Sequence, residues 1–254
     1  MFRRIKRLDS KINLMPFTLP EPSQKSEYVG ALFSRIAPFY DRMNRIMTFG
    51  QDIRWRKRVI DLLEPQNWKV YLDAGAGTGD LSQMIVTATQ SSIVVAVDLT
   101  REMINLGKKN HIDNRILWVQ ADTLSLPFKS DVFDGVVSGY VLRNVVNINQ
   151  AIGEQVRVTT AGTKVISLDT TPPENNLLYP FIQIYLRWIM PLLGKLVTGD
   201  AQAYRYLSVS SDRHLPSKEL DERMRLSGLT DVTHEKWMAG TMAIHSGRKN
   251  NQST

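Results

Sequence analysis

Glycines and carboxylates gather in residues 73–81, DAGAGTGDL. Gly75, Gly77 and Gly79 follow a run typical of a strand and open a run typical of a helix, so backbone N–H groups of the turn can face a ligand. A dinucleotide-binding turn needs a small residue where Asp80 stands, and this carboxylate opposes a pyrophosphate at the helix N-terminus. The turn therefore disfavours NAD.

Carboxylates close three successive predicted strands, at Asp73, Asp98 and Asp122. The carboxyl ends of parallel strands share one edge of the sheet, where open α/β sheets bind ligands. Carboxylates accept hydrogen bonds from an ammonium group, a ribose diol or an adenine amino group, and S-adenosylmethionine carries all three. Taken singly, Asp98 or Asp122 could instead be a helix cap, and the glycines alone could form an ordinary turn.

Metal and thiol chemistry finds little support in the sequence. The chain has no cysteine, which excludes disulfides, thiolate metal sites and a cysteine nucleophile and permits a reducing compartment. The histidines His111, His214, His234 and His245 show no helical or hairpin spacing to one another, so no metal site is predicted. His214 and His245 could approach an acceptor pocket or simply be satisfied structural residues.

Strand-like and helix-like runs alternate along most of the chain. A helix is expected over 29–47 with a break at Pro38, followed by a helix over 52–63. The expected strands are 70–74, 93–98, 116–121, 135–138 and 163–168. Short strands separated by helix-length segments predict an α/β fold with a mostly parallel sheet.

The charge of the 254-residue chain is unevenly spread. Residues 1–12 carry five basic side chains against Asp9, which gives +4 of the total +7. Such an arm suits an anionic membrane surface or nucleic acid, or it is a solvated tail. No secretion signal is evident. Residues 13–27 contain three prolines and are expected to be a linker, with the folded domain over 28–249 and a tail at 250–254.

An apolar segment spans residues 177–196, within a longer insertion at 174–199. Pro180, Pro191, Arg187 and Lys195 interrupt it, so it is a poor candidate for a membrane-spanning helix. It is expected to be either a buried helix pair or a lid or ramp for a lipophilic substrate.

Several blocks of the chain resemble the ubiquinone/menaquinone biosynthesis C-methyltransferases of the UbiE/MenG type, over roughly residues 29–249. The blocks are YDRMNRIMTFGQDIRW (40–55), DAGAGTGDL (73–81), LPFKSDVFDGVV (126–137), LRNV (142–145), RVTTAGTKVISLD (157–169), DAQAYRYLSVSS (200–211) and GTMAIHSGRK (240–249). The resemblance implies a class I methyltransferase, Rossmann-like fold whose seven-stranded, mostly parallel sheet has helices on both faces. It also implies S-adenosylmethionine as donor, a polyprenylated hydroquinone as acceptor, no metal, and a helical lid over 29–63.

The motifs and the resemblance together predict catalytic residues and residues that bind the methyl donor. The catalytic candidates are Arg143 and Asn144, which follow the fourth strand and could hold an oxyanion, with Tyr40 beside them as a hydroxyl partner. The residues expected to bind the donor are Asp73, Gly75, Gly77, Thr78, Gly79, Asp98, Leu99, Asp122, Thr123 and Gly139.

Several blocks depart from the family pattern, among them the turn at 75–77, the run at 159–163 and two blocks at strand ends. Gly139-Tyr140-Val141 stands where the family usually has serine before the Phe-Gly pair of an FG-x-RN block, and Asp169-Thr170-Thr171 stands where Glu-Phe-Ser is usual. These changes leave open methylation of another lipophilic phenol, or a non-catalytic role in a quinone-synthesis complex. An RNA methyltransferase is disfavoured because the excess charge lies mostly in the arm. We expect a lipophilic quinol as substrate, no nucleic acid, a homodimer or biosynthetic complex, and a cytoplasmic location at the inner face of the membrane.

Overall fold

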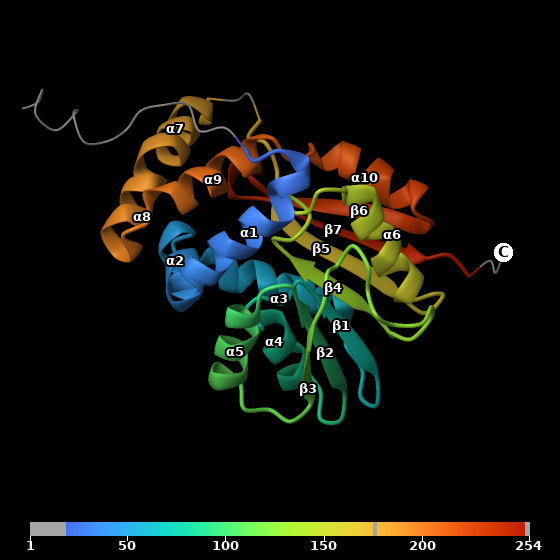
Figure 1. Cartoon of the computed structure of the whole chain (residues 1–254). Helices are drawn as coiled ribbons and strands as arrows, with labels where there is room; N and C mark the ends of the chain where they lie inside the picture. Colours follow the sequence, from blue (N-terminus) through green and yellow to red (C-terminus); the bar gives the residue numbers. More distant parts are fainter. Residues whose placement is uncertain (1–18, 175–176, 252–254) are drawn as a thin grey trace, which may run out of the picture.

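The structure is a computed structural model that describes residues 19–174 and 177–251. The predicted basic arm, the first part of the predicted linker and the last three residues lie outside the described residues. Figure 1 shows a twisted sheet with helices packed on both of its faces and a further group of helices to one side.

The sheet has seven strands in the order β3-β2-β1-β4-β5-β7-β6. Strands β1 to β5 run parallel, whereas β7 pairs antiparallel with both β5 and β6. This arrangement confirms the predicted fold class. The strands are β1 Val70–Ala74, β2 Ile93–Asp98, β3 Ile116–Gln120, β4 Val136–Gly139, β5 Lys164–Thr170, β6 Leu229–Trp237 and β7 Met242–Lys249.

Alternating side chains along the strands build two hydrophobic layers. Tyr71 and Val94 belong to the layer covered by α3 and α4, and their neighbours Leu72 and Val95 belong to the layer covered by α6 and α10. Successive strand side chains point to opposite faces, so strands buried on both faces are apolar at nearly every position. The helices are α1 Pro22–Ile36, α2 Tyr40–Met47, α3 Gln51–Leu63, α4 Asp80–Ala88, α5 Arg101–Asn110, α6 Ile148–Val158, α7 Tyr179–Ile184, α8 Met190–Thr198, α9 Ala201–Asp212 and α10 Ser217–Leu226.

The N-terminal helices begin earlier than predicted, and the last of them packs against the sheet. Helix α1 begins at Pro22, inside the predicted linker, because proline suits the first turn of a helix, where its missing N–H has no partner. The break predicted at Pro38 is confirmed by a 3₁₀ turn between α1 and α2. Trp55 of α3 is fully buried against the sheet, so α3 belongs to the sheet layer, and the part of the predicted lid 29–63 outside this layer consists of α1 and α2.

A third hydrophobic cluster holds α1 and α2 against α8 and α9. Leu32, Met43, Met190 and Tyr204 are among its buried members. This cluster shares no buried residue with the two sheet layers. The four helices therefore pack as a separate unit beside the sheet.

The apolar segment 177–196 does not form a buried helix pair, so that alternative is wrong. It consists of α7, a π-helical turn over Tyr185–Ile189 and α8. Much of its apolar surface faces solvent, with Phe181 70% and Trp188 54% exposed. Among residues 19–174 and 177–251, no helix has the length and apolar character needed to cross a membrane.

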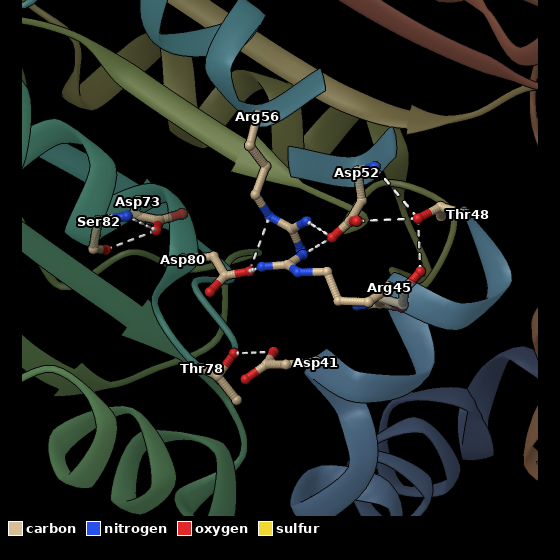
Figure 2. Close-up of polar contacts among 10 residues, drawn as sticks. Asp41, Arg45, Thr48, Asp52, Arg56, Asp73, Thr78, Asp80 and Ser82 are labelled. Atoms are coloured by element: carbon tan, nitrogen blue, oxygen red, sulfur yellow. Dashed lines mark hydrogen bonds and ion pairs between the residues drawn. The ribbon is translucent and has the colours of Figure 1, made fainter. Parts of the chain in front are cut away.

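A network of buried charges joins α2 and α3 to the start of α4 (Figure 2). Asp52 of α3 is fully buried and accepts hydrogen bonds from Thr48 at 3.0 Å and Arg56 at 2.5 Å. Arg45 of α2 pairs with Asp52 and, at 3.0 Å, with Asp80 at the N-terminus of α4. Arg56 also lies 3.4 Å from Asp80. The network fixes the lid helix α2 relative to the glycine turn that precedes α4.

Replacement of Asp52 should destabilise the fold. Asp52→Ala leaves the buried Arg56 guanidinium without its closest carboxylate, and breaking a buried ion pair in this way costs about 3–5 kcal/mol. The free energy of unfolding from urea titration measures the loss. Asp61→Ala removes an exposed carboxylate from the same helix and should change stability by less than about 0.5 kcal/mol. Equal losses in the two variants would show that the network does not anchor α3.

Candidate active site

A cavity lies along the carboxyl edge of β1, β2, β3 and β4, under helices α1 and α2. Phe33 and Tyr40 line it from the helical side. The helical unit therefore closes over the sheet edge where ligands of this fold class bind. The predicted residues in its lining are Tyr40, Gly75, Gly77, Asp98, Leu99, Asp122, Thr123, Gly139 and Asn144.

Asp98 at the end of β2 is oriented by two backbone groups. One carboxylate oxygen accepts from the Gly77 N–H and the other from the Thr100 N–H, both at 2.8 Å. Burial raises the pKa of Asp98, and these hydrogen bonds oppose the shift. A carboxylate oxygen accepts more than one hydrogen bond, so each retains capacity for a ligand donor. Asp98 thus fits a ribose diol.

The glycine turn is shaped by close packing. Gly75 has φ of 76°, and a β-carbon there would collide with Val141. Gly79 has φ of 90°, and its β-carbon would lie 2.6 Å from the Trp118 ring. Gly79 lines neither main cavity, which indicates a packing role.

Two other predicted donor-binding residues face protein groups. The Thr78 hydroxyl donates to Asp41 of α2 at 2.6 Å, which ties the turn to the lid. Asp73 accepts from the Ser82 N–H at 3.0 Å and from the Ser82 hydroxyl at 2.7 Å, as Figure 2 shows. Burial raises the pKa of Asp73 to about 6. Both residues position the turn and α4. They are absent from the lining of the donor cavity but line a smaller cavity that shares Gly75 with it, and Asp73 Oδ1 has no hydrogen-bond partner among the described residues.

A second and larger cavity, of about 420 Å³, adjoins the first. Its lining is mostly apolar and comes from α2, the α7–α8 segment, α9 and the loop before β7, with Met47, Phe181 and Leu207 among its members. Tyr140 lines both cavities. A lipophilic molecule in the second cavity would therefore meet a ligand of the first at this side chain. We refer to the two spaces as the donor cavity and the acceptor cavity.

The predicted catalytic residues lie where the two cavities meet. Arg143 lines the acceptor cavity and forms a buried ion pair with Asp169 at 3.3 Å. Asn144 lines the donor cavity, donates to the Tyr140 carbonyl at 2.8 Å and accepts from the Tyr206 hydroxyl at 3.2 Å. Tyr40 is half-buried; desolvation raises its pKa, while the charge of Arg143 acts in the opposite direction. The structure thus brings Arg143, Asn144 and Tyr40 together.

Tyr140 is a site residue that the sequence did not single out. Its φ of 61° is left-handed, a conformation uncommon for residues other than glycine and frequent at functional sites. Two guanidinium groups lie over its ring, that of Arg56 at 5.6 Å and that of Arg143 at 5.0 Å from the ring centroid. The only sequence signal was its position in the altered block before Arg143.

The histidine prediction was wrong in one respect. His234 and His245 are directly paired across the β6–β7 hairpin, with ring centroids 5.3 Å apart. His234 bonds to Asp221 at 2.7 Å and His245 to the Ser217 carbonyl at 3.1 Å. These three ionisable side chains are close enough to share an ion, and they line neither main cavity. The pairing was missed because no strand was predicted over 229–249; from Trp237–Met242 back to His234–His245 the register is regular.

The chain also resembles known proteins over nearly all of its length. A ubiquinone/menaquinone biosynthesis C-methyltransferase UbiE from Desulfotalea psychrophila is 38% identical over 89% of this chain and 92% of its own. A demethylmenaquinone methyltransferase from a Roseiflexus species is 38% identical over 91% of this chain and 97% of its own.

Solved structures agree on the fold. An S-adenosylmethionine-dependent methyltransferase from Thermotoga maritima superimposes with a TM-score of 0.62 at 17% identity, over 87% of this chain and 100% of its own. The profile of the ubiE/COQ5 methyltransferase family matches residues 22–249, which include both cavities. The fold, the sequence motifs at the site and the similar proteins agree, and this chain belongs to the ubiE/COQ5 methyltransferase family.

Proposed function

We propose that this protein transfers a methyl group from S-adenosylmethionine to a ring carbon of a polyprenylated quinol in quinone biosynthesis. The observation that carries the proposal is the pair of cavities that meet at Tyr140, one with an acidic strand edge and one mostly apolar. The relatives named for methylation in ubiquinone and menaquinone synthesis support the same reaction.

The donor cavity presents suitable groups for S-adenosylmethionine. Asp98 offers a carboxylate to the ribose, Asp122 and Thr123 stand at the end of β3 for the adenine, and Leu99 adds an apolar contact. Gly75 and Gly77 keep the turn free of side chains beside the ligand. S-adenosylmethionine supplies an activated methyl group on its sulfonium, and such a transfer needs no metal.

The protein's main task is alignment and charge stabilisation. Methyl transfer is an in-line displacement, so the acceptor carbon must be held on the axis of the breaking bond with water excluded. A ring carbon becomes nucleophilic as the neighbouring hydroxyl loses its proton. The Arg143 guanidinium, the Asn144 amide and the Tyr40 hydroxyl can stabilise the charge that develops on that oxygen. The Asp169 carboxylate holds Arg143 in place, because it accepts hydrogen bonds from the backbone N–H and from the guanidinium of Arg143.

We propose that the acceptor reaches the site from a membrane surface. Phe181 both lines the acceptor cavity and is 70% exposed, so the apolar lining continues onto the outer face of α7. Exposed apolar side chains continue with Trp188 in the π-helical turn and Leu196 in α8. An apolar face of this kind suits the interfacial layer of a bilayer, with Arg187 and Lys195 positioned near anionic headgroups.

Loss of Asp98 should weaken donor binding. Asp98→Ala removes charge-assisted hydrogen bonds to the ribose, worth about 2–3 kcal/mol, which corresponds to a rise in Kd of about 30- to 160-fold. Calorimetric titration with S-adenosylmethionine measures this. Asp131→Ala removes an exposed carboxylate bonded to Lys249 and lying outside the donor cavity, and should leave Kd unchanged. An unchanged Kd in Asp98→Ala would refute the ribose assignment.

Loss of Asn144 should slow methyl transfer far more than it weakens donor binding. Removal of one preorganised oxyanion donor costs about 10²–10³ in rate, because the interaction strengthens in the transition state. The assay follows label from S-adenosylmethionine into a demethylated menaquinol and locates the methyl group by mass spectrometry. Tyr40→Phe should also slow transfer in a folded protein.

Two outcomes would count against these assignments. A folded Asn144→Ala variant with full activity removes Asn144 from the chemistry. A wild-type protein that binds the donor and methylates no quinol, yet raises a partner's activity, favours a non-catalytic subunit.

Polar substitution of the exposed apolar face should weaken membrane binding. Phe181→Ser and Trp188→Ser each remove a large apolar side chain that would enter the interfacial layer, so co-sedimentation with anionic liposomes should fall several-fold. Ile112→Ser is the matched control, because Ile112 is 89% exposed in the loop between α5 and β3. Equal liposome binding by all three variants and the wild type would contradict docking through α7 and α8.

A further inference from the structure

Two hydroxyl groups at the acceptor cavity have no hydrogen-bond partner among the described residues. They are the Tyr140 hydroxyl and Thr170 Oγ1, and both oxygens are shielded from solvent. Both residues line the acceptor cavity. Buried polar groups in folded proteins are nearly always hydrogen-bonded, because an unsatisfied one loses its hydration without compensation. Two such groups at one cavity therefore point to a ligand that supplies the missing partner.

The fold places these two side chains at adjacent strand ends. Tyr140 directly follows β4, and Thr170 is the last residue of β5. The two strands are paired, with Gly139 opposite Leu168, so their carboxyl ends open onto the same space. Trp55 lines the same cavity, and its indole N–H is a further donor without a partner among the described residues.

The groups are suited to donate to an oxygen. Burial raises the pKa of Tyr140 to about 12, so its hydroxyl keeps its proton at neutral pH. An indole N–H can only donate, and a threonine hydroxyl can donate or accept. The nearby guanidinium groups of Arg56 and Arg143 also favour a partner with negative character. An apolar substituent would leave all three donors unsatisfied.

Both hydroxyls lie in the blocks that depart from the family pattern. Because the remaining lining of the cavity is mostly apolar, these oxygens give its inner wall a local polar character.

We propose that Tyr140 and Thr170, with the Trp55 indole, form a subsite that binds a second ring oxygen of the methyl acceptor. This inference rests on the proposed function: of the two ring oxygens of the quinol, one lies beside the methylated carbon and faces Arg143 and Asn144, and the other is assigned to this subsite. The hydroxyls are covered by neighbouring side chains, so the ring reaches them through a small movement of the cavity wall.

The test compares two acceptors on the full-length protein. One is a 1,4-dihydroxynaphthalene with a short prenyl chain, and the other is the matching 1-hydroxynaphthalene that lacks the second oxygen. The wild type should prefer the dihydroxy ring in kcat/KM. Tyr140→Phe and Thr170→Val should each reduce that preference about 5- to 10-fold, the effect of one hydrogen bond, because kcat/KM falls more for the dihydroxy ring than for the monohydroxy ring.

Matched controls remove hydroxyls that already have partners outside both cavities. Tyr71→Phe and Thr89→Val lose hydrogen bonds to the Gln66 N–H and the Ile85 carbonyl, and should leave the preference unchanged. An equal loss of activity on both rings in Tyr140→Phe and Thr170→Val would overturn the subsite, because it indicates a general structural effect.

Binding measurements separate the subsite from the proposed function. If the wild type methylates neither ring, the proposed function fails, and calorimetry of both rings with S-adenosylhomocysteine-loaded protein still tests the subsite. Tighter binding of the dihydroxy ring that disappears in Tyr140→Phe and Thr170→Val supports it. Equal binding of the two rings, or binding of neither, contradicts it.

Discussion

The pairing of buried charges between α2, α3 and α4 is the constraint on which the site depends. Asp52 and Arg56 are almost fully removed from water, and a buried charge is tolerated only in close contact with its partner. Arg45 extends this network from the lid helix to Asp80, at the residue after the glycine turn. The orientation of α2 is therefore set by charge geometry as well as by apolar packing. Since Tyr40 begins α2, the same constraint brings its side chain to the cavity edge.

A second ion pair holds the other side of the site. Asp169 ends the buried part of β5 and pairs with Arg143 in the loop after β4, so two adjacent strand ends are joined by charge. Tyr140 follows β4 in a left-handed conformation, and the guanidinium groups of Arg143 and Arg56 both lie over its ring. Strain of this kind persists only where the surroundings determine the backbone. The two ion-pair networks thus meet on one aromatic ring, and that ring separates the donor and acceptor cavities.

The sequence predicted those parts of the molecule that follow from local pattern. Strand runs such as Val94–Val97 are apolar at every position because both faces are covered, and their spacing gave the sheet. The placement of Asp98 at the cavity followed from its position at a strand end. Local pattern could not separate Asp73, whose carboxylate bonds to Ser82, from Asp98, which faces the cavity. The pairing of His234 with His245 depended on a hairpin that local pattern did not reveal, and the role of Tyr140 depended on contacts with residues distant in sequence.

The α7–α8 segment shows most clearly why composition alone did not suffice. Its apolar residues fit either a buried helix pair or an exposed ramp, and the difference lies in what surrounds the segment. In the structure the inner side of α7 lines a cavity while Phe181 also reaches solvent, and Trp188 lies on the exposed surface. Unpaired donors at Tyr140 and Thr170 lie in the cavity wall formed by the strand ends. The lining of the cavity thus changes from apolar at α7 to polar at Tyr140. A molecule that matches it has an apolar chain toward α7 and an oxygen-bearing ring toward Tyr140. That orientation carries the ring, and not the chain, to the boundary with the donor cavity, which is where a methyl group bound beside Asp98 and the glycine turn could be received.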